Sequence, residues 1–254
     1  MDLCERKNDL VVRHPWELAR LTAIRRLLKN ILIEERDCRV LDVGCGDGFI
    51  SRELFKNIDV ESITGIDTNL TDEEVSDFNT SSNNVTYFND YSSITQNNYQ
   101  LMLLLDVIEH VEDDKFFLRD IAKKYIVDNG YIVITAPAFQ ILFGSHDKFL
   151  KHHRRYNRKD LVDLVNHAKL ECLASGYFFL SLLPLRFVQL FCEKIVRNEG
   201  GKQTGIGRWN HRKWVTKAIE LALNEDARIS LALNKFGVVL PGLTVWAVCR
   251  KPLS

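Results

Sequence analysis

The sequence contains no pair of cysteines with the C-x-x-C spacing that is typical of structural zinc sites, although six of its 254 residues are cysteines. The cysteines are scattered and lie mostly inside apolar runs: Cys4, Cys38, Cys45, Cys172, Cys192 and Cys249. Reduced core thiols in a cytoplasmic protein are the simpler interpretation. No cluster of metal-ligating residues is visible in the sequence either, so we expect no metal site.

The chain also lacks a net charge, because 34 lysine and arginine residues balance 34 aspartate and glutamate residues. A neutral chain gives no general attraction to nucleic acid, so any preference for anions must come from a local patch. The most apolar stretch, 177–196, contains charged residues, whereas a membrane-spanning helix needs about 20 mostly uncharged ones. The polar residues 1–8 predict no signal peptide. We expect a cytoplasmic protein, with peripheral contact at the inner membrane face left open.

What the sequence does contain is a regular alternation of strand and helix patterns. The predicted strands are 39–43, 62–66, 85–88, 101–105, 131–135, 170–179 and 243–250, with a turn at 129–130. The predicted helices are 15–33, 49–56, 71–78, 113–127, one beginning near 160, 184–197 and 214–234. This alternation predicts an α/β fold with a Rossmann-like, seven-stranded, mostly parallel sheet and helices on both faces. We expect one domain over 1–254, with a lid helix at 15–33 near its N-terminus and a helical insertion at about 180–236 before the last strand.

A glycine-rich turn follows the first predicted strand, in the sequence D-V-G-C-G-D-G-F at 42–49. Glycines let a backbone approach a ligand closely, and the turn leads into a helix at the carboxyl ends of the strands. The dinucleotide fingerprint G-x-G-x-x-G requires a glycine where Phe49 stands, so a pyrophosphate site, as in a nucleotide-linked dehydrogenase, is disfavoured. The predicted cofactor contacts in this turn are Asp42, Gly44, Cys45, Gly46, Gly48 and Phe49.

An acidic residue, Asp67, ends the second predicted strand about 20 residues beyond the glycine turn, the position where a carboxylate usually binds ribose hydroxyls. A carboxylate suits a diol because it can accept two hydrogen bonds. We include the adjacent Thr68 in the predicted cofactor site.

In order and spacing, these residues resemble the class I methyltransferases that use S-adenosylmethionine (SAM) and release S-adenosylhomocysteine, over nearly the whole chain. The resemblance implies that the glycine turn lies along the methionine part of SAM, that Asp67 holds the ribose, and that Asp90 and Tyr91 contact the adenine. Asp106 and Val107 belong to L-D-V-I-E-H-V at 105–111, which is similar to the family's fourth-strand segment. A capping or salt-bridging role for the acids of that segment stays open.

Candidate acceptor residues follow the fourth and fifth predicted strands. His110 lies at the edge of the sheet where the methyl group is expected, and histidine can accept a proton near neutral pH. The segments 137–147 and 152–156 resemble a subgroup of bacterial small-molecule methyltransferases, with a proline-led loop, an H-D pair and an H-x-R-R-Y-like run. We expect His146, Asp147 and His153 to surround the acceptor, with Asp147 orienting a histidine. The alternative is that Asp147 pairs with an arginine and that the histidines lie on the surface.

Two features bear on the acceptor. Residues 146–159 contain six lysines or arginines and one acid, which is typical of an anion site or of a solvated helix start. The apolar residues of 178–191 predict a lid over an apolar acceptor, an interfacial helix, or a core or dimer face. We therefore expect methyl transfer from SAM to oxygen or nitrogen of a small-molecule or lipid-linked acceptor, by a monomer or homodimer. An RNA methyltransferase and a SAM-binding module without catalysis are the alternatives.

Overall fold

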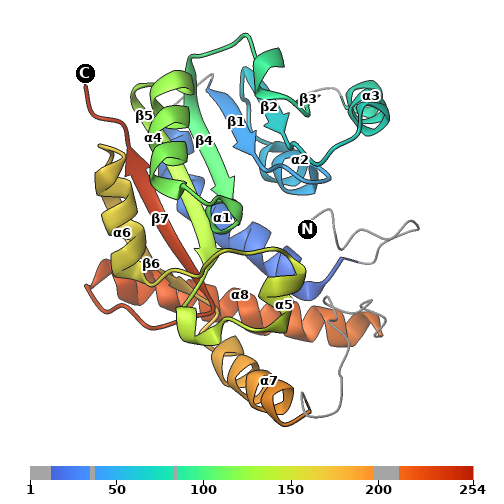
Figure 1. Ribbon diagram of the computed structural model, residues 1–254, viewed down its shortest axis with the longest axis vertical. Helices are drawn as coiled ribbons and strands as arrows, with labels where there is room; N and C mark the ends of the chain where they lie inside the picture. The colour runs from blue at the N-terminus through green and yellow to red at the C-terminus, as the bar shows by residue number, and fades with distance from the viewer. Residues whose placement is uncertain (1–12, 35–37, 83–84, 197–211, 254) are drawn as a thin grey trace.

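The computed structural model describes residues 13–34, 38–82, 85–196 and 212–253, so the prediction made on residues 1–8 falls outside it. Seven strands form one sheet in the order β3-β2-β1-β4-β5-β7-β6 (Figure 1). They are β1 (Arg39–Val43), β2 (Ser62–Ile66), β3 (Val85–Phe88), β4 (Tyr99–Leu105), β5 (Ile126–Pro137), β6 (Glu171–Phe178) and β7 (Thr244–Arg250). Within this sheet β7 is antiparallel to both of its neighbours, β5 and β6, and the other strand pairs are parallel. The predicted Rossmann-like, mostly parallel α/β sheet is therefore confirmed.

Helices cover both faces of the sheet, as predicted. They are α1 (Pro15–Glu34), α2 (Phe49–Phe55), α3 (Asp72–Ser81), α4 (Asp114–Tyr125), α5 (Ser145–Phe149), α6 (Arg158–His167), α7 (Leu182–Val196) and α8 (Lys213–Lys235). Alternate strand residues face opposite layers: Val40 packs in a cluster with α1, α2 and α8, whereas Leu41 packs in one with α4 and α6. This alternation follows from the two-residue period of a strand, and it explains why strands buried on both faces read as continuous apolar runs.

The structure adds one short helix, α5, and three single-turn helices that the periodicity did not predict: η2 (Tyr91–Ser93), η3 (Ile108–His110) and η4 (Gln140–Leu142). A segment of three to five residues is too short to show a helical repeat. Three of these four segments follow the carboxyl ends of β3, β4 and β5, where they place side chains at the edge of the sheet.

The predicted turn at Asn129–Gly130 lies inside β5 and is a correction to the sequence analysis. The pairing of β4 with β5 shifts register between Tyr99 and Leu101, opposite this point. Asn129 has a φ of 63°, which asparagine tolerates better than most residues. Main-chain hydrogen bonds to Lys251 of 2.8 and 2.9 Å hold the irregular residues in place. The turn signal therefore marked a bulge rather than the start of the strand.

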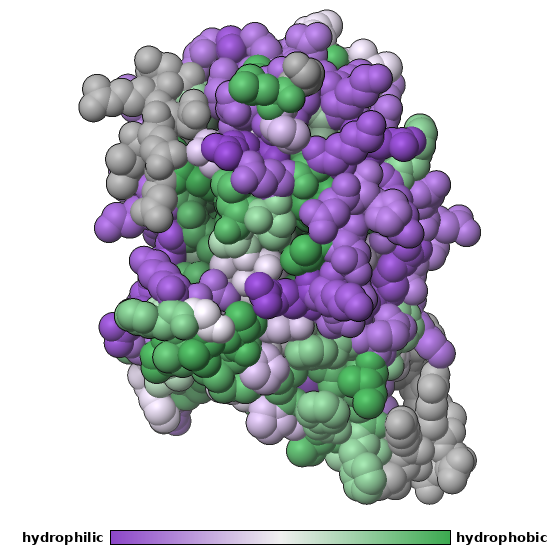
Figure 2. Space-filling view, turned by 90° about the vertical axis from the view of Figure 1, so that its left-hand side faces the viewer, coloured by the Kyte–Doolittle hydropathy of each residue, from purple (hydrophilic) through white to green (hydrophobic). Residues whose placement is uncertain are grey.

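The insertion before the last strand consists of α7 and α8, and β7 follows α8 as predicted. Helix α8 packs along α1, where Arg26 Nη1 donates to the carbonyl of Asn224 at 2.7 Å. Helix α7 stands at the lower end of the molecule, where apolar surface gathers in the space-filling view (Figures 1 and 2). Its exposed large apolar side chains are Leu185, Phe187, Val188 and Phe191. Within the described residues, no helix combines the length and apolarity that crossing a bilayer requires.

Candidate active site

The glycine turn forms a backbone cradle at the carboxyl end of β1. Gly44, Gly46 and Gly48 have φ values of 70°, 56° and 68°, a region that L side chains rarely adopt. A Cβ atom at Gly48 would lie 2.2 Å from Tyr87 Oη, and one at Gly44 would lie 2.5 Å from Val107 Cγ2. Glycine is therefore required here both by the backbone and by packing against the ends of β3 and β4.

The first helix reaches over this cradle. Arg13, just before α1, forms an ion pair with Asp47, and its guanidinium lies 4.1 Å from the centre of the Phe49 ring. Seven residues further on, about two helical turns, the buried Arg20 places Nη2 2.9 Å from Asp106 Oδ2. The sequence analysis named α1 as a lid, and these two contacts place its first half against the cradle and the end of β4.

Asp42, the first residue of the predicted cofactor turn, is almost fully buried and accepts a hydrogen bond from Ser51 Oγ. Burial raises the pKa of this carboxyl to about 6. Since its pKa in the unfolded chain is lower, the folded state binds more protons between these values, and the unfolding free energy falls as the pH rises through them.

This pKa leads to a testable pH dependence. Asp42→Asn keeps the shape and the acceptor for Ser51 but removes the ionisation, so it is expected to stabilise the protein more at pH 8 than at pH 4. The difference should be at most about 3 kcal/mol, because one pKa unit corresponds to about 1.4 kcal/mol. Urea unfolding of both proteins at the two pH values measures it. An equal effect of the substitution at both pH values would contradict the raised pKa.

Asp67 and Thr68 follow the end of β2. Asp67 is half-buried, and its oxygens accept hydrogen bonds from the amide of Gly46 at 3.0 Å and from the amide of Asn69 at 2.9 Å. The carboxylate is thereby fixed beside the cradle, at the predicted ribose position. Thr68 is exposed in the turn next to it.

Asp90 and Tyr91 follow β3. Asp90 is exposed and caps η2 by accepting hydrogen bonds from the amide, at 2.9 Å, and the hydroxyl of Ser92. These bonds lower the pKa of the Asp90 carboxyl. Contact of Asp90 and Tyr91 with the adenine stays a prediction.

The end of β4 bends sharply at Asp106, which has a φ of 59°. Its carboxylate accepts a hydrogen bond of 2.9 Å from Thr135 Oγ1 on β5 and pairs with Arg20. Val107 lies against Gly44. The salt-bridging alternative for Asp106 is therefore observed, while contact of Asp106 and Val107 with the cofactor stays a prediction.

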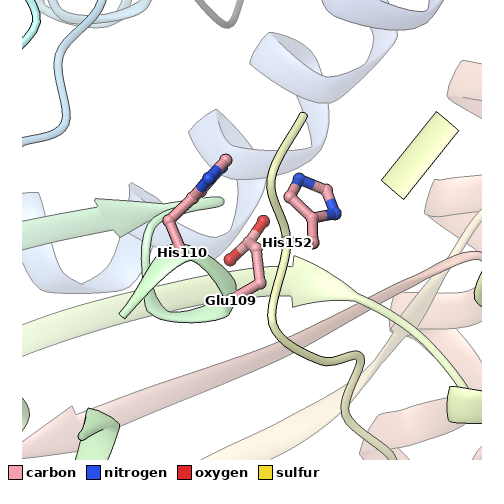
Figure 3. Close-up of side chains that lie close together, drawn as sticks. All are labelled: Glu109, His110 and His152. Atoms are coloured by element: carbon pink, nitrogen blue, oxygen red, sulfur yellow. The ribbon is translucent and has the colours of Figure 1, made fainter. Parts of the chain in front are cut away.

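Directly after this bend, Glu109, His110 and His152 come together; we call them the Glu109 cluster (Figure 3). One potential ligand atom of each residue lies within 4.8 Å of those of the other two. Glu109 is 0% exposed, and neither of its carboxylate oxygens has a hydrogen-bond partner among the described residues. Burial and the neighbouring Asp106 raise the pKa of Glu109 well above its usual range. The rings of His110 and His152 meet edge to face with centroids 4.6 Å apart.

Asp147 lies at 0% exposure behind this cluster. Its oxygens lie 3.1 Å from His152 Nδ1, 2.7 Å from Arg155 Nε and 3.1 Å from Arg186 Nη2. Burial acts to raise the pKa of Asp147, but the hydrogen bonds from His152 and Arg155 and the charge of Arg155 outweigh it and hold the pKa far below its usual range. The expected pairing of Asp147 with a histidine and the alternative pairing with an arginine are thus both present.

The other two predicted acceptor residues lie on the same loop but outside the cluster. His146 is partly buried on α5, and burial lowers the pKa of its imidazole. The His153 side chain is exposed, while its amide donates 2.8 Å to the carbonyl of Glu109. The histidine that Asp147 orients is His152, which was not among the predicted acceptor residues.

Sequence reasoning therefore missed Glu109 and His152 as site residues. Glu109 stood in the E-H-V segment next to His110, and His152 stood beside His153. The sequence did not reveal that a buried turn brings residues more than 40 positions apart within reach of each other.

The comparisons with known proteins agree with this geometry. A family of methyltransferase domains matches residues 16–175. The chain belongs to this family. Its fold is that of the class I SAM-dependent methyltransferases, so SAM is the cofactor that the family implies. The structure fits this cofactor, because Gly44 is exposed at the carboxyl end of β1 and the carboxylate of Asp67 lies beside the cradle, where it accepts a hydrogen bond from the amide of Gly46.

Ubiquinone biosynthesis O-methyltransferase of Rickettsia bellii is 29% identical over 149 residues, which cover 51% of this chain and 61% of that protein. The chain thus spans about three fifths of the length of this curated relative. A SAM-dependent methyltransferase of Archaeoglobus fulgidus has a TM-score of 0.52 and 18% identity, covering 91% of this chain and 94% of that chain. Phosphoethanolamine N-methyltransferase 2 of Haemonchus contortus, in complex with SAM, has a TM-score of 0.51 and 15% identity, covering 86% and 50%. At identities this low, the two structural matches show a shared fold and nothing further.

Removing the Asp67 carboxylate tests its predicted ribose contact. Asp67→Ala is expected to weaken S-adenosylhomocysteine binding by about 1–3 kcal/mol, or about 5- to 150-fold, because two charged hydrogen bonds are lost. Isothermal titration calorimetry measures the affinity. Asp77→Ala, at an exposed acid on α3, is the control and should bind as the unchanged protein does. Unchanged affinity in Asp67→Ala would place the ribose elsewhere.

Proposed function

We propose that this methyltransferase transfers the methyl group of SAM to a hydroxyl oxygen of a small-molecule or lipid-linked acceptor. The observation that carries the proposal is the Glu109 cluster, which lies just beyond Asp106 and Val107 at the carboxyl end of β4. When bound, SAM supplies an electrophilic methyl group and takes the electron pair of the broken carbon–sulfur bond. The acceptor oxygen forms the new bond to carbon and loses its proton, so it needs a group that activates it.

In this proposal His110 contacts the acceptor hydroxyl, and His152 lies beside it with its ring held by Asp147. Asp147 is fully buried, so we assign it a positioning role rather than contact with the acceptor. His146 and His153, on the same loop, line the outer side of the acceptor position.

Oxygen is favoured over nitrogen for two reasons. The matched curated relative is named as an O-methyltransferase. A neutral amine can attack a methyl group without first losing a proton, whereas a hydroxyl benefits from imidazoles and a carboxylate at the point of attack.

The apolar surface of α7 supports an acceptor with an apolar part. Leu185, Phe187 and Phe191 are exposed on this helix, which contacts η4 at the edge of the loop that carries His146. An anionic acceptor has less support, because Arg155 is paired with Asp147 and Arg154 with Asp114 at 2.9 Å. We further propose that α1, through Arg13 and Arg20, covers the cofactor site and forms one domain with the sheet and the α7–α8 insertion.

Incubation of the protein with methyl-labelled SAM and a cell extract tests the acceptor class. The extract is then separated into lipid, small-molecule, protein and RNA fractions. We expect label in the lipid or small-molecule fraction. The labelled methyl group should resist cleavage, as the methyl group of an ether does. Label in RNA, or in an amine, would overturn the proposal. The Asp67→Ala variant in the same extract is the control, because its labelling should fall together with its cofactor affinity.

A further inference from the structure

We propose that Glu109, His110 and His152 bind a divalent transition-metal ion such as Zn²⁺. The cluster offers two imidazole nitrogens and one carboxylate oxygen, the donor set of a catalytic zinc site with a position left open. Ligands about 2.1 Å from a tetrahedral ion lie about 3.4 Å apart. The potential ligand atoms here all lie within 4.8 Å of one another, so small side-chain rotations bring them to an ion.

The buried carboxylate of Glu109 indicates that a ligand binds at this position. A buried polar atom without a partner costs about 1–3 kcal/mol, and folded proteins rarely keep one. Both oxygens of Glu109 lack a partner among the described residues. Protonation of Glu109 would not remove this cost, since the new hydroxyl would still need an acceptor. A bound cation satisfies the carboxylate directly.

The orientation of the His152 ring also suits a metal ligand. Its Nδ1 lies 3.1 Å from Asp147 Oδ1, which leaves Nε2 to bind a metal. A carboxylate behind a ligating histidine is the usual outer shell of a metal site, because it fixes the tautomer and the ring. Asp147 is itself held by Arg155 and Arg186, so the carboxylate is rigid.

A main-chain hydrogen bond fixes the two halves of the site together. The amide of His153 donates 2.8 Å to the carbonyl of Glu109, which ties the residue after His152 to the turn that carries His110. The His110 and His152 rings, with centroids 4.6 Å apart, therefore approach Glu109 from two sides (Figure 3).

Three protein ligands leave room in the coordination sphere for an oxygen of the acceptor. The ion would lower the pKa of that hydroxyl, so that its proton passes to solvent and the oxygen attacks as an anion. This second step rests on the proposed function, whereas metal binding itself does not.

Calorimetric titration of the chelator-treated protein with Zn²⁺ alone tests the site without any acceptor. One ion per chain is expected, and Mg²⁺ at the same concentration should bind far more weakly because it prefers oxygen ligands. Glu109→Gln and His152→Asn should each weaken Zn²⁺ binding by about 100-fold or more, since even outer-shell substitutions cost 10–100-fold. His167→Asn, at an exposed histidine on α6, is the matched control and should bind as the unchanged protein does.

Retained stabilisation by S-adenosylhomocysteine shows that each variant is folded. No Zn²⁺ binding to a protein that still binds S-adenosylhomocysteine would overturn the metal site and leave methyl transfer untouched. Equal Zn²⁺ affinity in Glu109→Gln, His152→Asn and the unchanged protein would place the ion elsewhere and also overturn it. Failure of the proposed function would instead appear as label in RNA or amines, with Zn²⁺ binding unaffected.

Discussion

Replacing His110 with alanine is expected to lower kcat for methyl transfer by about 10²–10⁴-fold, the usual contribution of a group that activates the reacting oxygen. The imidazole lies at the end of β4, beside the buried Glu109 and against the ring of His152. Alanine removes one of the two imidazoles of this cluster and leaves Glu109 and His152 in place. S-adenosylhomocysteine affinity should change by less than a factor of about two, because the cradle is built from other residues.

Single-turnover assays with labelled SAM and the acceptor found by fractionation measure this effect. His167→Ala serves as the control, because this histidine is exposed on α6, where its Nδ1 lies 3.2 Å from the carbonyl of Asp163. A kcat in His110→Ala within a factor of about three of the unchanged protein would remove His110 from the chemistry. The same assay on His146→Ala and His153→Ala separates the contributions of the outer histidines, and full activity in both would leave the Glu109 cluster as the whole acceptor site.

Asp147→Asn is expected to lower the free energy of unfolding by about 3–5 kcal/mol, which corresponds to about 6–20 °C in melting temperature for a chain of this size. The carboxylate is fully buried between two buried guanidinium groups, those of Arg155 and Arg186. Asparagine keeps the volume but leaves Arg155 without its counter-charge and leaves Arg186 with the more distant Glu193 at 3.5 Å, and an uncompensated buried charge is costly. The loop that carries His152 loses its anchor at the same time.

A surface pair provides the matched control. Arg250 and Glu171 form the same type of contact at 2.7 Å, but both side chains are exposed. Glu171→Gln should cost about 0–1 kcal/mol, because water solvates the remaining charge. Denaturant unfolding of the two variants side by side measures the difference. If both substitutions had the same small effect, the arginines near Asp147 would have to find other partners, and its anchoring role would be wrong.

Local sequence was sufficient where a feature depends on neighbours along the chain. The apolar run at 101–105 predicted a strand, and all five of these residues are buried in β4. The glycine pattern at 44–48 predicted a tight turn after the first strand, and all three glycines adopt the positive φ values that such a turn uses. These features follow from backbone sterics and from the two-residue period of a strand, which act within a few residues.

The pairings of the site depended on contacts between distant segments. The partner of Asp106 is Arg20, on a helix 86 positions earlier, and the arginine that completes the Asp147 anchor, Arg186, comes from the α7 insertion. A charged residue in the sequence looks the same whether it is solvated or buried against a counter-charge, because its burial depends on which segments pack over it.

The sequence by itself therefore determined the order of the strands and helices, the glycine cradle and the acid at the end of β2. Only the tertiary structure decided that Glu109 is buried without a partner, that Asp147 orients His152 rather than His146 or His153, and that the turn at Asn129 is a bulge within β5. The physical reason is that strand and turn propensities are set locally, whereas burial and pairing are set by how segments distant in the sequence pack together.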